Sequence, residues 1–433
     1  MKNFFLAILR VCLKALAKMT IVRYEPAIIG ITGSVGKTST KEAIRAVVAH
    51  ERTVRATLKN FNNELGLPLT ILGNWDSAGG ALFWLKVIFV SLKNLFIRNA
   101  SYPEVLVLEY GVDRPGDMKY LLEIARPHIS IFTAMGTIPV HVEFFADPES
   151  VFREKVKIVS QLSVTGFVVL NADDELVLSA HSDTRAHIIT FGFSEKSEMR
   201  VISFSNRLDD TFQGTSLKLV HGGSVVPIHI PYVFGRAQGY AISAAAAVGV
   251  IFGMNLVSIV DALASYNSPN GRMRIISGVK ETTLIDDTYN ASPVAMKDAV
   301  DALKSISAKR KVAVLADMLE IGKYTLVAHE TLGKHVAKTA DILVTVGIRG
   351  KFIAEAAIRA GMQKKSVNIF MSVCEAGKFL QKKITKGDVI LIKGSQGTRM
   401  EKIVKELMAE PRDAERLLVR QSEYWLARPG LYD

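Results

Sequence analysis

The chain has 433 residues, of which 49% are hydrophobic, and it contains no low-complexity tract. This length and composition exclude a disordered protein and predict two or three folded domains with sizeable cores. The two cysteines, Cys12 and Cys374, lie far apart in sequence, which argues against a zinc cluster or a disulfide framework and fits a reducing compartment. The formal net charge of +12 raises the question of an anionic partner.

Much of the positive charge lies in two apolar segments. Residues 1–25 carry a net charge of +4 and residues 81–102 a net charge of +3, which together make 7 of the 12 excess charges. Since both segments are also rich in Leu, Ile and Phe, they are more typical of membrane-surface helices than of a nucleic-acid groove, and we expect no nucleic-acid partner. The alternative is that the apolar faces of 1–24 and 81–98 pack on the protein itself or on a partner subunit.

Neither segment is predicted to cross a membrane. Charges recur every four residues in the first, and the apolar run of the second spans only 17 residues. A signal peptide is also unconvincing, because Arg10 and Lys14 would interrupt its apolar core. We therefore expect a cytoplasmic protein, with a peripheral position at the inner face of the membrane as an option.

The sequence TGSVGKTS, residues 32–39, stands between an apolar run at 27–31 and a helix-like run at 41–49. Glycines that turn the backbone, a lysine that reaches the outer phosphates and a following helix are the parts of a phosphate-binding loop. An ordinary glycine-rich turn is the alternative, but the Lys-Thr pair favours a nucleoside triphosphate, and Thr38 would ligate Mg²⁺. The residues expected to hold the nucleotide here are Gly33, Ser34, Gly36, Lys37, Thr38 and Ser39.

The remaining pattern alternates strands and helices, which predicts an α/β protein. We expect a short N-terminal amphipathic helix at 1–25, a central ATP-binding domain with a parallel sheet at 26–270, and a Rossmann-like doubly wound domain at 271–433. Strands are predicted at 27–31, 105–110, 129–134, 166–171, 283–286, 312–316, 342–346 and 389–393, with a small antiparallel elaboration at 186–233 and a hinge at 267–271. The last twenty residues carry little signal.

Polar side chains stand at the ends of several predicted strands, where open α/β sheets place their sites. Glu109 ends one strand and is well placed to bind a metal ion, Asp286 and Asp287 end another, and His141 lies fourteen residues before Lys155. Taken singly, these residues have structural explanations: a salt bridge, a helix cap and a loop histidine. Taken together, they indicate a catalytic site.

Eight motifs in one order make the chain similar to the Mur ligases, which form amide bonds in peptidoglycan precursors with ATP, and among them to the members that add D-alanyl-D-alanine. The motifs are TGSVGKTS, NNELGLPLTIL (62–72), VLEYGVDRPGDM (107–118), NADDE (171–175), PNGRM (269–273), IDDTYNASPVAM (285–296), VLADMLEIG (314–322) with His329, and GDVILIKGSQGTRME (387–401). They extend over about residues 27–405.

The resemblance implies a reaction in which the carboxylate of an anionic muropeptide acceptor attacks the γ-phosphate of ATP, and the amine of an amino acid or dipeptide then displaces phosphate. Lys37 would contact the outer phosphates, while Thr38 and Glu109 would hold Mg²⁺. His141 and Lys155 match a second metal position, where the lysine is typically carbamylated and so becomes an anionic oxygen ligand.

The resemblance also assigns roles to further residues, most of them in the second half of the chain. Arg272 matches a γ-phosphate contact at the hinge. The further residues that match nucleotide contacts are Gln238, Asp286, Asn290 and Asp317, and those that match substrate contacts are Asn62, Asn63, Lys393, Gly394 and Ser395. Since these residues come from both domains, catalysis is expected to need closure about 267–272.

The chain departs from the family in several places. Only about 26 residues precede the first predicted strand, so we expect the family's N-terminal UDP-binding domain to be missing, and the connection from Leu72 to Val105 is unusually long. Gln238 stands where the family usually has an Asn that contacts adenine, and Gln396 replaces an arginine. Lys157 stands where an acid is common beside the carbamylated lysine.

Three functions follow as hypotheses. The first is an ATP-dependent ligase that adds D-Ala-D-Ala to UDP-N-acetylmuramoyl-tripeptide. The second is a ligase of the same type that acts on a lipid-linked muropeptide or a γ-glutamyl acceptor. The third, from a different class, is a membrane-associated nucleotide-binding module without ligase activity.

Overall fold

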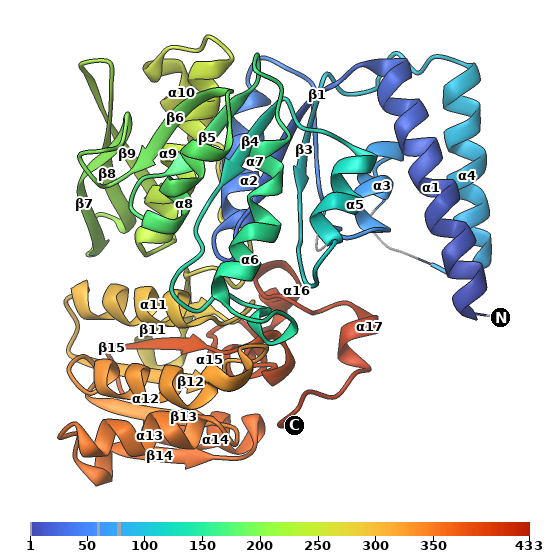
Figure 1. Ribbon diagram of the computed structural model, residues 1–433. Coiled ribbons are helices and arrows are strands. Elements are labelled where there is room, and N and C mark those ends of the chain that lie inside the picture. The colour runs from blue at the N-terminus through green and yellow to red at the C-terminus, as the bar shows by residue number, and fades with distance from the viewer. Residues whose placement is uncertain (1, 59–60, 76–78) are drawn as a thin grey trace.

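The computed structural model describes residues 2–58, 61–75 and 79–433, so Met1 of the predicted N-terminal helix lies outside the described residues. Two sheets, each covered by helices, lie one above the other (Figure 1). The upper body, as drawn in Figure 1, comprises α1 to α10, and the lower body comprises β10 to α17. Both sheets are mostly parallel, which confirms the α/β prediction, while the proposed boundary at residue 270 stays a prediction.

The upper sheet has the strand order β2-β3-β1-β4-β5-β6-β7-β8-β9. Its strands are β1 (Ala27–Thr32), β2 (Val54–Ala56), β3 (Val105–Glu109), β4 (Ile129–Phe132), β5 (Phe167–Asn171), β6 (His187–Gly192), β7 (Met199–Leu208), β8 (Gln213–His221) and β9 (Ser224–Pro231). The central strands are continuous apolar runs, because helices cover both of their faces. The carboxyl ends of β1, β3 and β4 meet at one edge, above the lower body.

The expected antiparallel elaboration at 186–233 is correct for β7, β8 and β9 but wrong for β6. β6 pairs with β5 in parallel, with Phe167 opposite His187. The physical reason is the crossover through α8 (Glu175–Ser179), which returns the chain to the same edge of the sheet before β6 begins.

Helices α2 (Lys37–Val48), α9 (Arg236–Ile251) and α10 (Leu256–Leu263) pack together against the upper sheet. α2 begins at Lys37, four residues earlier than the expected helix-like run, so the lysine of the loop lies in its first turn. The smaller helices of this body are α5 (Asp117–Ile124), α6 (Pro148–Lys155) and α7 (Lys157–Ser160).

The lower sheet has the order β10-β11-β15-β12-β13-β14, and only β10 runs antiparallel to its neighbour. Its strands are β10 (Arg274–Gly278), β11 (Thr282–Asp287), β12 (Arg310–Ala316), β13 (Ile342–Val346), β14 (Val367–Phe370) and β15 (Asp388–Lys393). Its helices are α11 (Pro293–Ser305), α12 (Thr325–Val336), α13 (Gly350–Arg359), α14 (Val373–Lys383), α15 (Glu401–Leu407), α16 (Ala414–Leu417) and α17 (Glu423–Leu426). All eight predicted strands of the two bodies are present, with ends that differ from the predicted ones by at most two residues.

Helices α1 (Lys2–Tyr24), α3 (Gly66–Leu72) and α4 (Ala81–Phe96) form a separate layer at one edge of the upper body (Figure 1). They share a small apolar core, which consists of Leu9, Leu13, Leu16, Leu69, Leu72, Trp84 and Val87. No helix within the described residues is long and apolar enough to span a membrane.

The layer formed by α1, α3 and α4, which we call the edge layer, allows a test of how α1 packs on its neighbours. Leu13 is fully buried whereas Val11, on the same helix, is 70% exposed. Leu13→Ala should lower the free energy of unfolding by about 2–5 kcal/mol, because it leaves a cavity between α1 and its neighbours. Val11→Ala should change it by less than about 0.5 kcal/mol. Urea titration of both variants measures the difference, and equal losses would contradict the packing described for α1.

Candidate active site

The loop between β1 and α2 is held in a turned conformation that glycine permits. Gly33 has φ 139° and Gly36 has φ 90°, and a Cβ at Gly33 would lie 2.1 Å from Thr133 Oγ1. Ser34 N and Val35 N donate to Ala134 O at 2.6 and 3.3 Å, which fixes the first half of the loop to the end of β4. The N–H groups of the first turn of α2 have no partner within the helix, so they can bind an anion.

Lys37 and Thr38 stand at the start of α2, opposite Glu109 at the end of β3. Lys37 Nζ donates to Gly33 O at 2.7 Å, and burial lowers the pKa of Lys37. Thr38 Oγ1 lies 3.5 Å from Glu109 Oε2, and buried Lys41 Nζ lies 3.2 Å from Glu109 Oε1. The site thus contains a half-buried cation beside a paired hydroxyl and carboxylate.

The Thr38–Glu109 pair fits a magnesium ion. Glu109 Oε1 is buried and makes no hydrogen bond of acceptable geometry, although Lys41 partly compensates its charge. A hydroxyl and a carboxylate are the hard oxygen ligands that Mg²⁺ prefers. Within the described residues no group of three or more His, Cys, Asp or Glu side chains could hold a metal, so an ion here would take its other ligands from phosphate or water.

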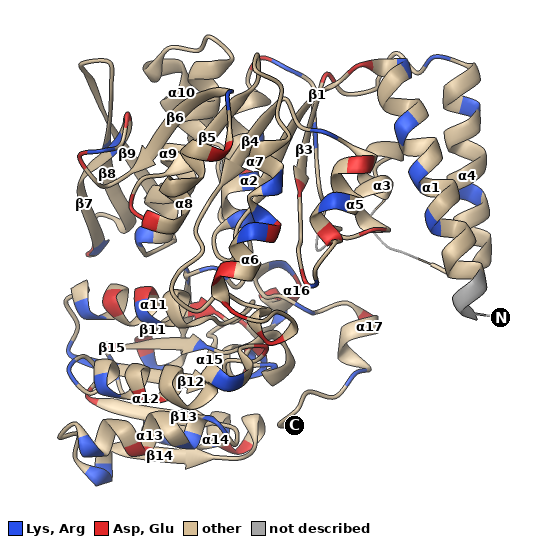
Figure 2. Cartoon of the chain, in the orientation of Figure 1, with Lys and Arg blue, Asp and Glu red and all other residues tan. Residues whose placement is uncertain are grey.

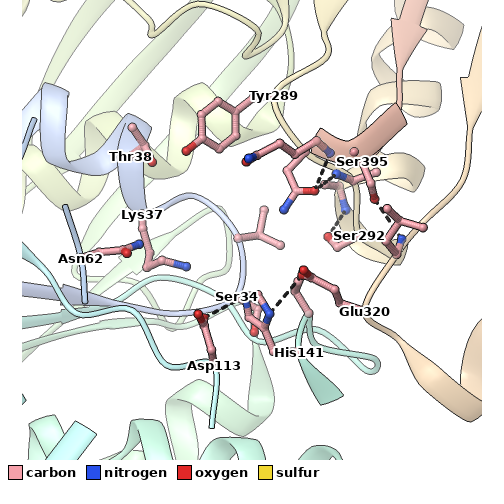
Figure 3. Close-up of a pocket in the computed structure, with 18 of the residues that line it drawn as sticks. Ser34, Lys37, Thr38, Asn62, Asp113, His141, Tyr289, Ser292, Glu320 and Ser395 are labelled. Atoms are coloured by element: carbon pink, nitrogen blue, oxygen red, sulfur yellow. Dashed lines mark hydrogen bonds and ion pairs between the residues drawn. The ribbon is translucent and has the colours of Figure 1, made fainter. Parts of the chain in front are cut away.

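His141 connects the two bodies. Its Nε2 lies 3.3 Å from Asp113 Oδ1 of the upper body, and its Nδ1 lies 3.1 Å from Glu320 Oε2 of the lower body (Figure 3). The hydrogen bond from His141 lowers the pKa of Glu320. Both His141 and Glu320 have positive φ angles, 68° and 62°, which are uncommon for residues other than glycine. This contact spans the space between the phosphate loop and the lower sheet.

Lys155 ends α6 and is only 1% exposed. Burial, and after it the charge of Lys37, lowers the pKa of Lys155 to about 7. Among the described residues no hydrogen bond or ion pair to its ammonium group is present. Its neighbour Lys157 is instead paired with Glu154 Oε2 at 2.6 Å. Lys155 is therefore a buried amine that is partly neutral at physiological pH.

The lower body contributes Arg272 and the segment after β11. The Arg272 guanidinium lies over the Tyr289 ring, 4.0 Å from its centroid, and its Nε is buried without a hydrogen bond. Asn290 Oδ1 accepts a hydrogen bond from Gln396 N at 3.3 Å. Arg272 thus has donor capacity left for an anion.

Several predicted residues are engaged by protein groups. Lys393 Nζ pairs with Asp287 Oδ2 at 2.6 Å and donates to Asn290 O, and burial lowers the pKa of Lys393. Asp286 accepts two hydrogen bonds from Thr288, and burial raises the pKa of Asp286 to about 6. Both side chains support the segment that carries Asn290.

Asp317 and Gln238 are likewise satisfied inside the protein. Asp317 accepts hydrogen bonds from Gly350 N at 2.7 Å and from Tyr432 Oη at 2.6 Å. Gln238 accepts from Tyr266 Oη at 2.8 Å and donates to Ser268 Oγ at 3.2 Å. Ser395 Oγ accepts from Leu319 N at 2.9 Å, while its residue still lines the site.

One pocket of about 520 Å³ joins the two bodies (Figure 3). Of the residues expected in the site, those that line it are Ser34, Gly36, Lys37, Thr38, Asn62, Asn63, Glu109, His141, Arg272, Asn290 and Ser395. Those that do not line it are Gly33, Ser39, Lys155, Gln238, Asp286, Asp317, Lys393 and Gly394. The structure therefore brings the phosphate loop and the hinge arginine to a single space.

The pocket also contains residues that the sequence did not single out for the site. Asp113, Ser292, Glu320 and Arg399 line it, and so does Trp425 from the C-terminal segment. Arg399 Nη1 donates to Trp425 O and Arg428 O, at 3.0 and 2.8 Å, and fixes that segment against the pocket. Arg399 and Glu320 belong to the matching motifs and could have been found there, whereas Trp425 carries no local signal.

Comparison with known families agrees with this geometry. The Mur ligase middle domain matches residues 31–79 and 90–249, and the domain described as Mur ligase, glutamate ligase domain matches residues 271–396. The chain belongs to the Mur ligase family. Residues 80–89, in the first half of α4, interrupt the middle-domain match.

Individual Mur ligases are similar over most of the chain. The UDP-N-acetylmuramoyl-tripeptide–D-alanyl-D-alanine ligase of Bacillus subtilis is 28% identical over 401 residues, which cover 92% of this chain and 79% of the relative. The structure of MurF ligase from Thermotoga maritima in complex with ADP has a TM-score of 0.76 and 26% identity, and covers 92% of this chain and 83% of its own. MurF from Acinetobacter baumannii has a TM-score of 0.76 and 25% identity, and covers 93% and 81%. The protein is an ATP-dependent ligase of the Mur type.

The environment of Lys155 predicts a pH dependence of stability. Because its pKa falls from 10.5 in the unfolded chain to about 7 in the folded protein, the unfolded chain binds one more proton across that window. Stability should therefore rise with pH between about 7 and 9, and Lys155→Met should remove this contribution to the slope. Urea titrations in buffer free of carbon dioxide measure the slope, with Lys157→Met as the control. Equal slopes in the wild type and Lys155→Met would show that Lys155 is not desolvated.

Proposed function

We propose that this protein adds D-alanyl-D-alanine to UDP-N-acetylmuramoyl-tripeptide, with conversion of ATP to ADP and phosphate, in peptidoglycan precursor synthesis. The observation that carries the proposal is that one pocket joins Lys37 and Thr38 of the upper body with Arg272 and Asn290 of the lower body. The similarity to ligases named for this reaction supports the choice of substrates.

In the first step, a carboxylate oxygen of the acceptor attacks the γ-phosphorus of ATP. The bond from phosphorus to the bridging oxygen breaks, which gives an acyl phosphate and ADP. Lys37 from the upper body and Arg272 from the lower body, which both line the pocket, stabilise the negative charge of the transferring phosphoryl group. Because both side chains are half-buried in the walls of the pocket, their charges act more strongly than they would in bulk solvent.

In the second step, the amine of the dipeptide attacks the acyl carbon. A tetrahedral intermediate forms and collapses with loss of inorganic phosphate, and the amine releases a proton. Asn62, Asn63 and Ser395, which line the pocket, are the proposed substrate contacts together with the neighbouring Gly394, and Lys393 supports them by fixing Asn290. The nucleotide contacts proposed for Gln238, Asp286 and Asp317 would need those side chains to exchange protein partners for ATP.

Thr38 and Glu109 would hold Mg²⁺, which supplies positive charge at the phosphates. His141 and a carbamylated Lys155 are the proposed second metal position. A neutral lysine can add carbon dioxide and lose a proton, which converts the amine into an anionic carbamate. The lowered pKa of Lys155 supports this step, because it makes the neutral amine available near pH 7.

Three domains, at 1–25, 26–270 and 271–433, remain our proposed division of the chain. The contact between His141 and Glu320 supports closure of the last two about 267–272, since it ties the two walls of the pocket together.

A lipid-linked muropeptide is the second candidate acceptor, and with it we propose a cytoplasmic enzyme peripheral to the inner face of the membrane. The observation that favours this candidate is the apolar, cationic outer side of α1 and α4. The retained Lys37, Thr38 and Glu109 argue against a nucleotide-binding module without ligase activity, since their arrangement serves phosphoryl transfer.

The proposal predicts phosphate release that depends on both substrates. The full chain should release phosphate from ATP only when UDP-N-acetylmuramoyl-tripeptide and D-alanyl-D-alanine are both present, and mass spectrometry should find a product heavier by one dipeptide residue. EDTA should abolish release and added Mg²⁺ should restore it. Lys37→Ala should lower kcat by about 100-fold to 1,000-fold, because it removes a charge that stabilises the phosphoryl group.

The control for this assay is Lys364→Ala, on an exposed surface outside the pocket, which should leave kcat unchanged. Release that needs only one substrate, or none, would contradict the proposed reaction. Release that instead depends on a lipid-linked acceptor would identify the second candidate.

Carbamylation of Lys155 can be observed directly. With ¹³C-bicarbonate at pH 8, above the pKa of about 7, the wild-type protein should show a carbamate carbon signal by NMR. Lys155→Met should lose the signal and Lys157→Met should keep it, because Lys157 is paired with Glu154. A signal that persists in Lys155→Met would place the modification on another amine.

A further inference from the structure

Helix α4 carries two apolar stripes instead of one. Its inner stripe, Trp84 and Val87, is buried in the core of the edge layer, and buried Ser91 continues the same side of the helix. Its outer stripe recurs at the same helical spacing of three and four residues but is exposed to solvent: Leu82, Leu85, Phe89, Leu92 and Phe96. Leu85 is 62% exposed and Phe89 is 70% exposed. The packing of the protein explains the inner stripe only.

Helix α1 lies beside α4 (Figure 1) and has the same pattern of buried and exposed apolar residues. Leu9, Leu13 and Leu16 are buried, whereas a second set is exposed at helical spacing: Phe5, Ile8, Val11, Met19 and Val22. Together with the outer stripe of α4, these residues form what we call the outer face. Isolated exposed apolar residues are ordinary, but two neighbouring stripes of them mark an interaction surface.

The outer face is flanked by positive charge (Figure 2). Neither α1 nor α4 contains an acidic residue. Arg10 and Lys14 pair with Glu64 and Glu123 of the neighbouring segments. The remaining cations around the face, for which no ion pair is present among the described residues, are Lys18, Arg23, Lys86, Lys93 and Arg98.

We propose that the outer face docks on the surface of an anionic lipid bilayer. Apolar side chains flanked by lysines match the acyl boundary and the phosphate headgroups of such a surface at the same time. No described helix is long and apolar enough to span a membrane, so the helices would lie in the plane of the interface.

A second copy of the chain is a poorer occupant of this face. In a two-fold dimer the face would meet itself, so the cations that flank it in one copy, such as Lys86 and Lys93, would meet the cations of the other copy. Since α1 and α4 offer no carboxylate to compensate, like charges would oppose the contact.

Helix α3 lies between the outer face and the pocket. Leu69 and Leu72 of α3 pack in the core shared with α1 and α4. At the other end of α3, Asn63 Oδ1 accepts hydrogen bonds from Leu65 N and Gly66 N, and Asn63 also lines the pocket. A protein docked in this way holds its pocket close to the membrane surface.

The test is sedimentation of the full chain with vesicles of phosphatidylcholine, with and without phosphatidylglycerol. We expect binding only when phosphatidylglycerol is present, and weaker binding as salt rises. Leu85→Asp with Phe89→Asp should weaken binding at least about 10-fold, because two inserted apolar side chains are lost. Lys86→Glu with Lys93→Glu should weaken it as well.

Two matched controls use sites far from the outer face. Val257→Asp with Leu326→Asp places the same charges at exposed apolar residues, and Lys364→Glu with Lys365→Glu makes the same reversal at exposed lysines. Both controls should bind vesicles as the wild type does. ATP binding by every variant verifies that it is folded.

Three results would overturn the proposal: no binding to either vesicle, equal binding by the wild type and the outer-face variants, or a dimer in light scattering that the Leu85→Asp and Phe89→Asp changes dissociate. The last result would assign the face to a second copy. The proposal on docking and the proposed ligase reaction are tested independently. Phosphate release is measured with a soluble acceptor and without vesicles, so either proposal can be wrong while the other is right.

Discussion

The structure depends on cations that the fold partly withdraws from water before any phosphate is bound. Lys37 is half-buried at the start of α2, and Arg272 is held over Tyr289 with a buried nitrogen that makes no hydrogen bond. Burial of a charge is unfavourable unless a group of opposite charge compensates it. Glu109 and Asp113 supply part of that compensation, and a polyanionic substrate is suited to supply the rest. The two cations come from different bodies, so the same electrostatic need that binds the nucleotide also favours their approach.

The contact between His141 and Glu320 shows how the two bodies are held while the pocket remains open to a ligand. It joins a loop of the upper sheet to a loop of the lower sheet, and the left-handed backbone at both residues aims the side chains across the gap. Such backbone conformations persist only where the surroundings enforce them. The wall of the pocket near the phosphate loop is therefore built from a long-range contact that no local sequence pattern contains.

Local patterns predicted the parts of the protein that local physics determines. The apolar strands, the turn at Gly33 and Gly36, and the polar residues at strand ends follow from periodicity and from glycine, so eight strands and the phosphate loop could be expected. The strands β2, β10 and β14 were not predicted. The direction of β6 could not, because a strand of its composition fits either orientation until the crossover that precedes it is known.

The sequence predicted the active site less completely than the fold, for a similar reason. Asp317 and Gln238 were expected to face the nucleotide, but each finds protein partners, Tyr432 and Tyr266, that lie far away in sequence. Trp425 was not expected, because contacts between residues distant in sequence, such as the hydrogen bonds from Arg399 to Trp425 O and Arg428 O, bring the C-terminal segment to the pocket. A motif gives the chemistry of a side chain, whereas the tertiary fold decides whether that chemistry is directed at a ligand or used within the protein.

The edge layer shows why one amphipathic pattern supported two interpretations. Its cationic, apolar sequences fitted both packing on the protein and contact with a membrane, because periodicity reports that apolar faces exist and not what covers them. In the structure the inner leucines of α1 and the inner stripe of α4 pack on the protein, while their outer residues remain exposed. Each helix therefore has one apolar face more than the core of the protein requires. This second face exposes apolar area to water and adds nothing to the free energy of folding. An anionic surface would bury that apolar area and would pair with the flanking lysines.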